Sequence, residues 1–132
     1  MRLDQMSNDG LSPAVKRFIR ENIQSVEQIE ILALMRNTPA REWTAHTLDQ
    51  TLRSSEQSIS RRLADFARAG LLVESEAVAK TYRYQPRDSA LDAAAAETLQ
   101  AYRTRPVLVI ETIFKPDDPG QSFADAFRIR PR

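Results

Sequence analysis

The chain has 132 residues, a length typical of one domain with at most a short appendage, which excludes a large multidomain enzyme. Hydrophobic residues make up 42% and charged residues 28% of the chain, as in average globular proteins, so the sequence can bury a core. It contains no cysteine, which excludes disulfides, zinc ribbons and thiol nucleophiles and favours a reducing cytoplasm. The longest apolar runs fall far below the roughly 20 residues of a membrane span, and the first ten residues lack the apolar core of a signal peptide. We therefore expect a cytoplasmic protein with no membrane partner.

The distribution of charge restricts any nucleic-acid site to a local patch. Nineteen bases against eighteen acids give a net charge of +1, which excludes the broad basic field of a histone-like binder. The basic excess lies mainly in residues 53–87, which hold seven bases and four acids. Sixteen of the nineteen bases are arginine, a bias that suits bidentate contacts to phosphate or guanine but that a GC-rich coding sequence also produces.

The N-terminal part of the chain predicts a tail followed by two helices. Residues 1–11 show no periodic pattern and are expected to form a flexible tail. Ser12 followed by proline is an N-cap with proline at the first helical position, and it predicts a helix over about 13–23. Ser25 predicts the cap of a second, more buried helix, which should end at Thr38 because the residue before a proline is pushed out of the α region.

Two further helices precede a change of period. Thr44 can cap a third helix that ends near residue 52, and Ser55 can cap a fourth over about 56–69. Gly70 follows where a left-handed stop is expected. The apolar positions of the fourth helix follow helical spacing and should be buried: Ile59, Leu63, Phe66 and Ala67. The opposite face should be exposed, and it holds polar residues: Gln57, Ser58, Arg61, Arg62 and Asp65.

After the glycine the pattern changes to alternation. Residues 71–75 and 78–85 predict the two strands of a hairpin, and the absence of glycine from its turn predicts a short tip. Tyr82 and Tyr84 alternate along the second strand, which favours core packing over base stacking. Trp43, before the third helix, is expected to fill a gap in the core by its bulk.

The C-terminal part predicts a long helix and one ambiguous segment. Asp88 or Ser89 can cap an alanine-rich helix that ends near residue 104. Residues 106–114 begin with proline and have helical apolar spacing, but their β-branched content also fits a strand; we favour the helix. A turn-rich loop is expected over 115–120, followed by a last helical piece from Ser122 with two phenylalanines on one face.

This order of elements resembles a winged helix-turn-helix domain, as found in bacterial transcription regulators of the MarR and related kinds. The resemblance covers about half of the chain, Ser25 to Gln85. Its most specific stretch is Ser54-Ser-Glu-Gln-Ser-Ile-Ser-Arg-Arg-Leu-Ala-Asp-Phe-Ala-Arg-Ala-Gly-Leu-Leu-Val-Glu74, which looks like a recognition helix running into the first wing strand. The resemblance implies a mainly α fold with a small β-hairpin wing. The helices predicted on either side of it make this a winged helix-turn-helix with extra N- and C-terminal helices. The domain should span 12–87, with 88–132 as a helical extension.

The resemblance implies sequence-specific binding of duplex DNA, with the helix over 55–69 in the major groove. Arginine can grip guanine by two hydrogen bonds, glutamine can do the same for adenine, and serine or a helix N-terminus can hold phosphate. The acidic wing weakens this expectation, because Glu74 and Glu76 flank its turn. The candidate DNA-binding residues are Ser55, Gln57, Ser58, Arg61, Arg62, Lys80 and Arg83.

The alternative is a winged-helix module that binds another protein and never contacts DNA. The near-zero net charge and the acidic wing favour this alternative, whereas the arginine pair of the fourth helix favours DNA. An enzyme is not expected, because the chain has one histidine, His46, and no glycine-rich phosphate loop. Asp117 and Asp118 lie in a proline-flanked loop where solvation is expected. We expect neither a cofactor nor a metal.

Residues 88–132 are the candidate surface for a homodimer or a protein partner, because a three-helix core does not need them. In regulators of the resembling kinds, helices outside the reading head pair two copies, which sets two recognition helices about one DNA turn apart. Alternatively, this segment folds back on the first helix, where Phe18 and Ile19 need cover. The candidate interface residues are Leu91, Ala95, Leu99, Tyr102, Val107, Ile110 and Phe114.

Overall fold

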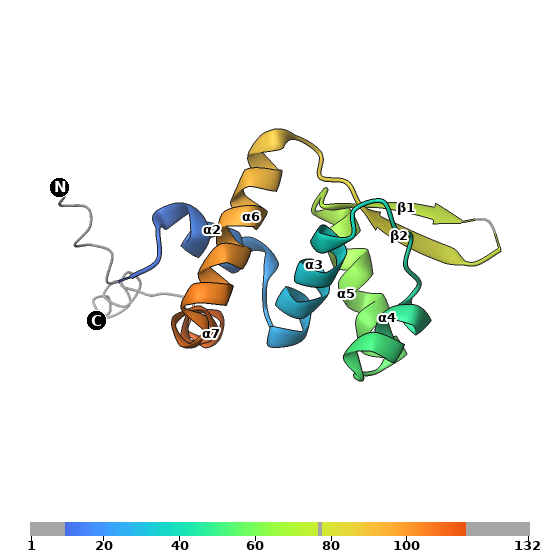
Figure 1. Ribbon diagram of the computed structural model, residues 1–132, viewed down its shortest axis with the longest axis horizontal. Coiled ribbons are helices and arrows are strands. Elements are labelled where there is room, and N and C mark those ends of the chain that lie inside the picture. The colour runs from blue at the N-terminus through green and yellow to red at the C-terminus, as the bar shows by residue number, and fades with distance from the viewer. Residues whose placement is uncertain (1–9, 77, 116–132) are drawn as a thin grey trace, which may run out of the picture.

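The computed structural model of the chain describes residues 10–76 and 78–115. These residues form mainly helices together with one two-stranded antiparallel sheet, as the sequence predicts (Figure 1). The expected tail over residues 1–9, the loop after Lys115 and the helical piece from Ser122 lie outside the described residues. The elements, in chain order, are α2 Pro13–Asn22, α3 Val26–Asn37, α4 Ala45–Leu52, α5 Glu56–Arg68, β1 Leu72–Glu76, β2 Lys80–Tyr84, α6 Ser89–Thr104 and α7 Pro106–Phe114.

The helices begin where short polar side chains satisfy the first free backbone N–H groups. Each predicted cap accepts a hydrogen bond from the backbone N–H three residues further on, and these caps are Ser12, Ser25, Thr44, Ser55 and Asp88. Helix α7 has no side-chain cap but begins with Pro106, whose fixed φ suits the first helical position. The ambiguous segment 106–114 is therefore a helix, and the predicted helix starts are confirmed.

Gly70 ends α5 and turns the chain into the hairpin. Its φ is +87°, a left-handed conformation that favours glycine, and a Cβ atom placed there would lie 2.5 Å from Arg87 Nη1. The N–H of Leu71 donates to the carbonyl of Phe66 at 3.0 Å, which closes the end of the helix. The predicted left-handed stop is confirmed, and it fixes the angle at which β1 leaves α5.

The hairpin is attached to the loop that precedes α4. Strand β1 pairs with β2 in a register that places Leu72 opposite Tyr84. The backbone of Trp43 exchanges two hydrogen bonds with that of Tyr82, each 2.8 Å long, so a short third segment extends the sheet. Tyr82 and Tyr84 are buried, as is Trp43, so all three aromatic side chains pack in the core as predicted. This pairing ties α4 to the hairpin through the backbone.

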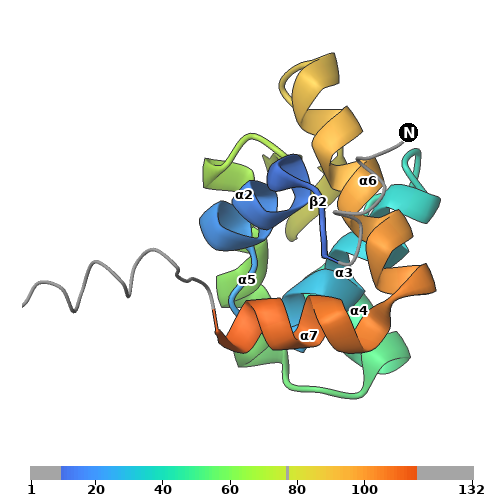
Figure 2. The ribbon, with the colours of Figure 1, turned by 90° about the vertical axis from the view of Figure 1, so that its left-hand side faces the viewer.

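Helix α3 lies between two groups of helices. On one side α2, α6 and α7 pack together, and on the other α4 and α5 pack together beside the hairpin (Figures 1 and 2). The fold-back alternative for residues 88–115 is thus what the structure shows, since α6 and α7 contact α2. Leu11, assigned to the tail from sequence, is buried with this group. Within the described residues, every helix is too short or too polar to cross a bilayer.

Candidate nucleic-acid interface

Helix α5 has one buried side and one open polar side. The cap residue Ser55 is exposed, and its hydroxyl oxygen accepts a hydrogen bond from the N–H of Ser58. The buried side is the predicted one, because Ile59, Leu63 and Phe66 are at most 1% exposed, although Ala67, also expected to be buried, is half-buried. Its exposed positions are Glu56, Gln57, Ser60, Arg61 and Arg68. Glu56, at the first position, lies against His46 of α4. The other four are spaced three, four or seven residues apart and share one side of the helix: Gln57, Ser60, Arg61 and Arg68. We call these four residues the α5 stripe.

Two of the predicted reading residues lie beside this stripe and are engaged by another helix. Ser58 Oγ donates to Glu27 Oε1 of α3 at 2.6 Å, and Arg62 Nε donates to the same oxygen at 3.2 Å. The hydroxyl of Ser54 donates to the other oxygen of Glu27. The side chains of Arg62 and Glu27 are only 20% and 18% exposed. Ser58 and Arg62, expected on the exposed side of α5, are half-buried, because the first turn of α3 covers that flank of the helix.

The groups around Glu27 favour its ionised form. Partial burial by itself raises the pKa of Glu27, but hydrogen bonds from Ser54, Ser58 and Arg62 outweigh burial and bring the pKa below its ordinary value. The charge of Arg62 is therefore compensated within the chain. Asp65, also expected on the open face, is half-buried and pairs with Arg68 of the stripe.

The two bases predicted at the hairpin are likewise close to carboxylates. Lys80 Nζ lies 3.5 Å from Glu74 Oε2, and the negative charge of Glu74 raises the pKa of Lys80. Arg83 Nη1 lies 3.7 Å from Glu42 Oε2, in the loop before α4. Both pairs are partly exposed and so are weak, yet they leave the hairpin without a net basic surface. Val78, at the tip of the hairpin, is fully exposed.

Arg53, in the turn between α4 and α5, was missed by the sequence analysis. It is exposed and has φ 61° and ψ 51°, a left-handed conformation that is uncommon for a residue with a Cβ atom. Its N–H donates to the carbonyl of Asp49 at 2.7 Å, which holds the turn closed. Among residues 10–76 and 78–115, neither Arg53 nor Arg61 has an ion pair. The one available signal was a base directly before a Ser-Ser cap.

The single histidine pairs with a carboxylate at the surface. His46 Nδ1 lies 2.5 Å from Glu56 Oε2, and both side chains are more than half exposed, so the contact links the first turns of α4 and α5 at the surface. In the part of the chain that the structure describes, no group of three His, Cys, Asp or Glu side chains could hold a metal ion.

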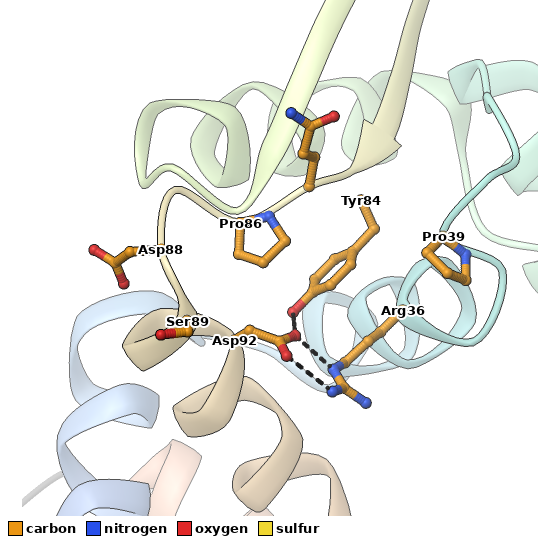
Figure 3. A pocket seen from close by; sticks show the side chains of 8 residues that line it. Arg36, Pro39, Tyr84, Pro86, Asp88, Ser89 and Asp92 are labelled. Atoms are coloured by element: carbon orange, nitrogen blue, oxygen red, sulfur yellow. Dashed lines mark hydrogen bonds and ion pairs between the residues drawn. The ribbon is translucent and has the colours of Figure 1, made fainter.

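A hollow of about 570 Å³ lies where the hairpin ends and α6 begins, and two of the charged groups that line it, Arg36 and Asp92, pair with each other (Figure 3). Asp92 accepts hydrogen bonds from Arg36 Nε at 3.1 Å, Arg36 Nη2 at 3.3 Å and the Tyr84 hydroxyl at 2.6 Å. These bonds hold the pKa of Asp92 below its ordinary value, and burial together with the bond to Asp92 raises the pKa of Tyr84. The arrangement joins α3, β2 and α6.

The predicted interface residues separate into a buried and an exposed set. Ala95 and Leu99 are buried in the core of the chain itself, so they cannot contact a partner. Leu91 and Ile110 are half-buried, as is Tyr102, whose hydroxyl donates to Glu30 Oε2 at 2.6 Å. This hydrogen bond, with burial, raises the pKa of Tyr102 to about 12. The two large apolar side chains of α7 that face solvent are Val107, 67% exposed, and Phe114, 64% exposed.

No family model, curated protein or solved structure matches the chain. Its function can therefore be inferred only from its own geometry and chemistry.

Proposed function

We propose that the chain is a cytoplasmic winged helix-turn-helix transcription regulator that binds duplex DNA with α5 in the major groove. The observation that carries this proposal is the α5 stripe, which no other described element covers. Helix α4 packs against α5, and the hairpin follows Gly70 directly, in the positions of the first helix of the motif and of the wing. The backbone pairing of Trp43 with Tyr82 supports the same arrangement, because it attaches the motif to its wing.

The stripe offers the groups that read base edges. Arg61 can donate two hydrogen bonds to guanine, and Gln57 can both donate to and accept from adenine. Ser60 can donate to a base edge or a phosphate oxygen. Because Arg62 is compensated by Glu27, Arg61 is the residue of the original arginine pair that carries the proposal.

We also propose that the regulator is a homodimer that pairs through α7. Val107 and Phe114 are seven residues apart and so lie on one side of the helix, with Ile110 half-buried between them. Helix α7 lies at the end of the molecule away from α5 (Figure 1), so pairing there leaves both α5 stripes open. In this proposal the chain is a binding protein and not an enzyme.

A second candidate, a winged-helix module that binds a protein, is favoured by the hairpin. Glu74 and Glu42 neutralise the two bases there, and the tip carries an exposed valine, Val78, rather than a base. An acidic hairpin with an apolar tip suits a protein surface better than a phosphate backbone.

The deciding experiment compares Arg61→Ala with a matched control, Arg20→Ala. Arg20 is exposed on α2, on the far side of α3, so both variants remove one surface arginine. Binding of a labelled duplex of mixed sequence is measured at low salt. In a second experiment, the genomic fragments that the protein binds are sequenced and searched for one enriched palindrome. We expect Arg61→Ala to cost on the order of 1 to 3 kcal/mol at the enriched site, and Arg20→Ala to bind like wild type. Absence of DNA binding by the wild type at low salt would favour the protein-binding candidate.

A further inference from the structure

We propose that Arg53 contacts a DNA phosphate and that Glu27 excludes Arg62 from the interface. This inference rests on the proposed function and replaces the arginine pair expected from sequence, Arg61 and Arg62, by Arg53 and Arg61.

The backbone of Arg53 provides the first argument. A left-handed conformation crowds the Cβ atom of any L-residue, so glycine or asparagine is the usual choice at such a position. Arginine here stores local strain, and strained positions cluster at functional sites. The side chain at this strained position is an exposed cation that has no ion pair among the described residues.

The location of Arg53 provides the second argument. It directly precedes Ser54 and the cap of α5, Ser55, so it stands at the end of α5 that enters a groove first in a helix-turn-helix complex. A base in this turn is placed to reach the phosphates at the edge of the groove while the α5 stripe faces the base pairs. A purely structural role is the competing explanation, because a cation at the C-terminal end of α4 also interacts favourably with the helix dipole.

Arg62 is excluded by its partners. Its Nε group shares Glu27 Oε1 with the Ser58 hydroxyl, and Ser54 holds the other carboxylate oxygen, so four side chains from α3, the turn and α5 form one neutral cluster. A DNA phosphate that recruited Arg62 would have to compete with a carboxylate that is already in place. Arg62 therefore adds little to the release of counterions from DNA.

The test measures the dissociation constant for a labelled duplex of mixed sequence as a function of salt concentration. The logarithm of the dissociation constant rises linearly with the logarithm of the salt concentration, and each phosphate contact contributes about 0.9 to this slope, whatever the DNA sequence. We expect Arg53→Gly to lower the slope by about one and to weaken binding several-fold at low salt, while Arg53→Lys retains the slope because it keeps the charge. The melting temperature of Arg53→Gly should be equal to or above that of wild type, because glycine relieves the strained conformation.

The Glu27 half of the proposal is tested by charge pairing. Glu27→Gln should raise the slope by about one, because Arg62 becomes available, and the double variant Glu27→Gln with Arg62→Gln should return it to the wild-type value. Glu21→Gln on α2 is the control, since it makes the same change of net charge away from α5.

Three results would overturn the inference, and they are distinguishable. An unchanged slope for Arg53→Gly, with a lowered melting temperature, would assign Arg53 the purely structural role. A slope reduced by about one in the double variant would show that Arg62 contacts phosphate in the wild type. Absence of DNA binding by the wild type would remove both this inference and the proposed function.

Discussion

The two sides of α3 share one apolar core but expose different side chains. On the side of α4, α5 and the hairpin, polar pairs cross between elements at the surface, such as Glu27 with Arg62 and Glu42 with Arg83. On the side of α2, α6 and α7, hydrogen bonds such as those of Ser12 with Glu97 and of Tyr102 with Glu30 also cross between elements, and α7 exposes the apolar side chains of Val107 and Phe114. The exposed side of α5 is polar, whereas α7 exposes two large apolar side chains.

This difference explains how a chain with a net charge of +1 can have two distinct surfaces. Charges that are paired within the chain cost little to keep at the surface and hold α5 in one orientation. Exposed hydrocarbon gains free energy only when something covers it. The polar side therefore suits a hydrated, charged ligand, and the apolar side suits a protein surface such as a second copy.

The largest effect on stability is expected from removing a buried aromatic ring beside the hairpin, compared with an exposed one on α7. Phe66→Ala empties a site that is 1% exposed and should destabilise the fold by about 3 to 5 kcal/mol through lost burial and a residual cavity. Phe114→Ala is the matched control at a protein concentration too low for pairing through α7, because the Phe114 side chain is 64% exposed and its loss should change the free energy of unfolding of the monomer very little. Urea denaturation measures both. Similar values for the two variants would contradict the assigned buried face of α5.

A smaller effect is expected where the two sides meet. Asp92→Asn removes the negative charge that Arg36 and Tyr84 share between α3, β2 and α6. Because the Asp92 side chain is 38% exposed, solvent weakens the ion pair, and we expect a loss of about 1 kcal/mol. Glu111→Gln is the control, since Glu111 is exposed on α7. A loss no greater than that of the control would show that the two sides are held together without this contact.

A pH dependence on the acid side follows from the same carboxylates. Glu27 and Asp92 have a lower pKa in the folded chain than in the unfolded chain, so their contribution is complete above an ordinary carboxyl pKa of about 4 and is lost as the pH falls through the folded values. Unfolding by urea between about pH 6 and 3 should show this loss. The double variant Glu27→Gln with Asp92→Asn should show a flatter profile, and an unchanged profile would assign the acid sensitivity to other groups.

The smallest effect on stability, with a large effect on assembly, is expected at α7. The double variant Val107→Ser with Phe114→Ser should change the free energy of unfolding of the monomer by less than about 0.5 kcal/mol, because both side chains are exposed. Light scattering at micromolar concentration should show a dimer for the wild type and a monomer for the variant. A monomeric wild type would contradict the proposed pairing.

Local features of the fold could be predicted from sequence, because their causes lie within a few residues. A cap such as Ser25 is defined by the backbone three residues further on, and Gly70 by its own φ. The buried side of α5 could also be predicted, from the helical spacing of its apolar residues. The flank of α5 was not, because the residue that covers it, Glu27, lies 31 positions before Ser58 and 35 before Arg62.

The same limit explains the interface residues. Helical spacing places Leu99 on an apolar side of its helix, but it does not show whether a second copy or another helix of the same chain packs against that side. The structure shows α2 packed against α6. The left-handed conformation of Arg53 could not be predicted, because arginine is not the residue that such a conformation selects.

The attachment of the hairpin has a spectroscopic consequence. Trp43 is the sole tryptophan of the chain, and its indole is 2% exposed, with Nε1 donating to Thr38 Oγ1 at 3.1 Å and the Arg41 guanidinium 3.7 Å from the ring centre. Because its backbone pairs with Tyr82, release of the hairpin would expose the indole to water and shift its emission to longer wavelength. The chain thus carries an intrinsic fluorophore where the hairpin joins the helices, and movement there on ligand binding can be followed without a label.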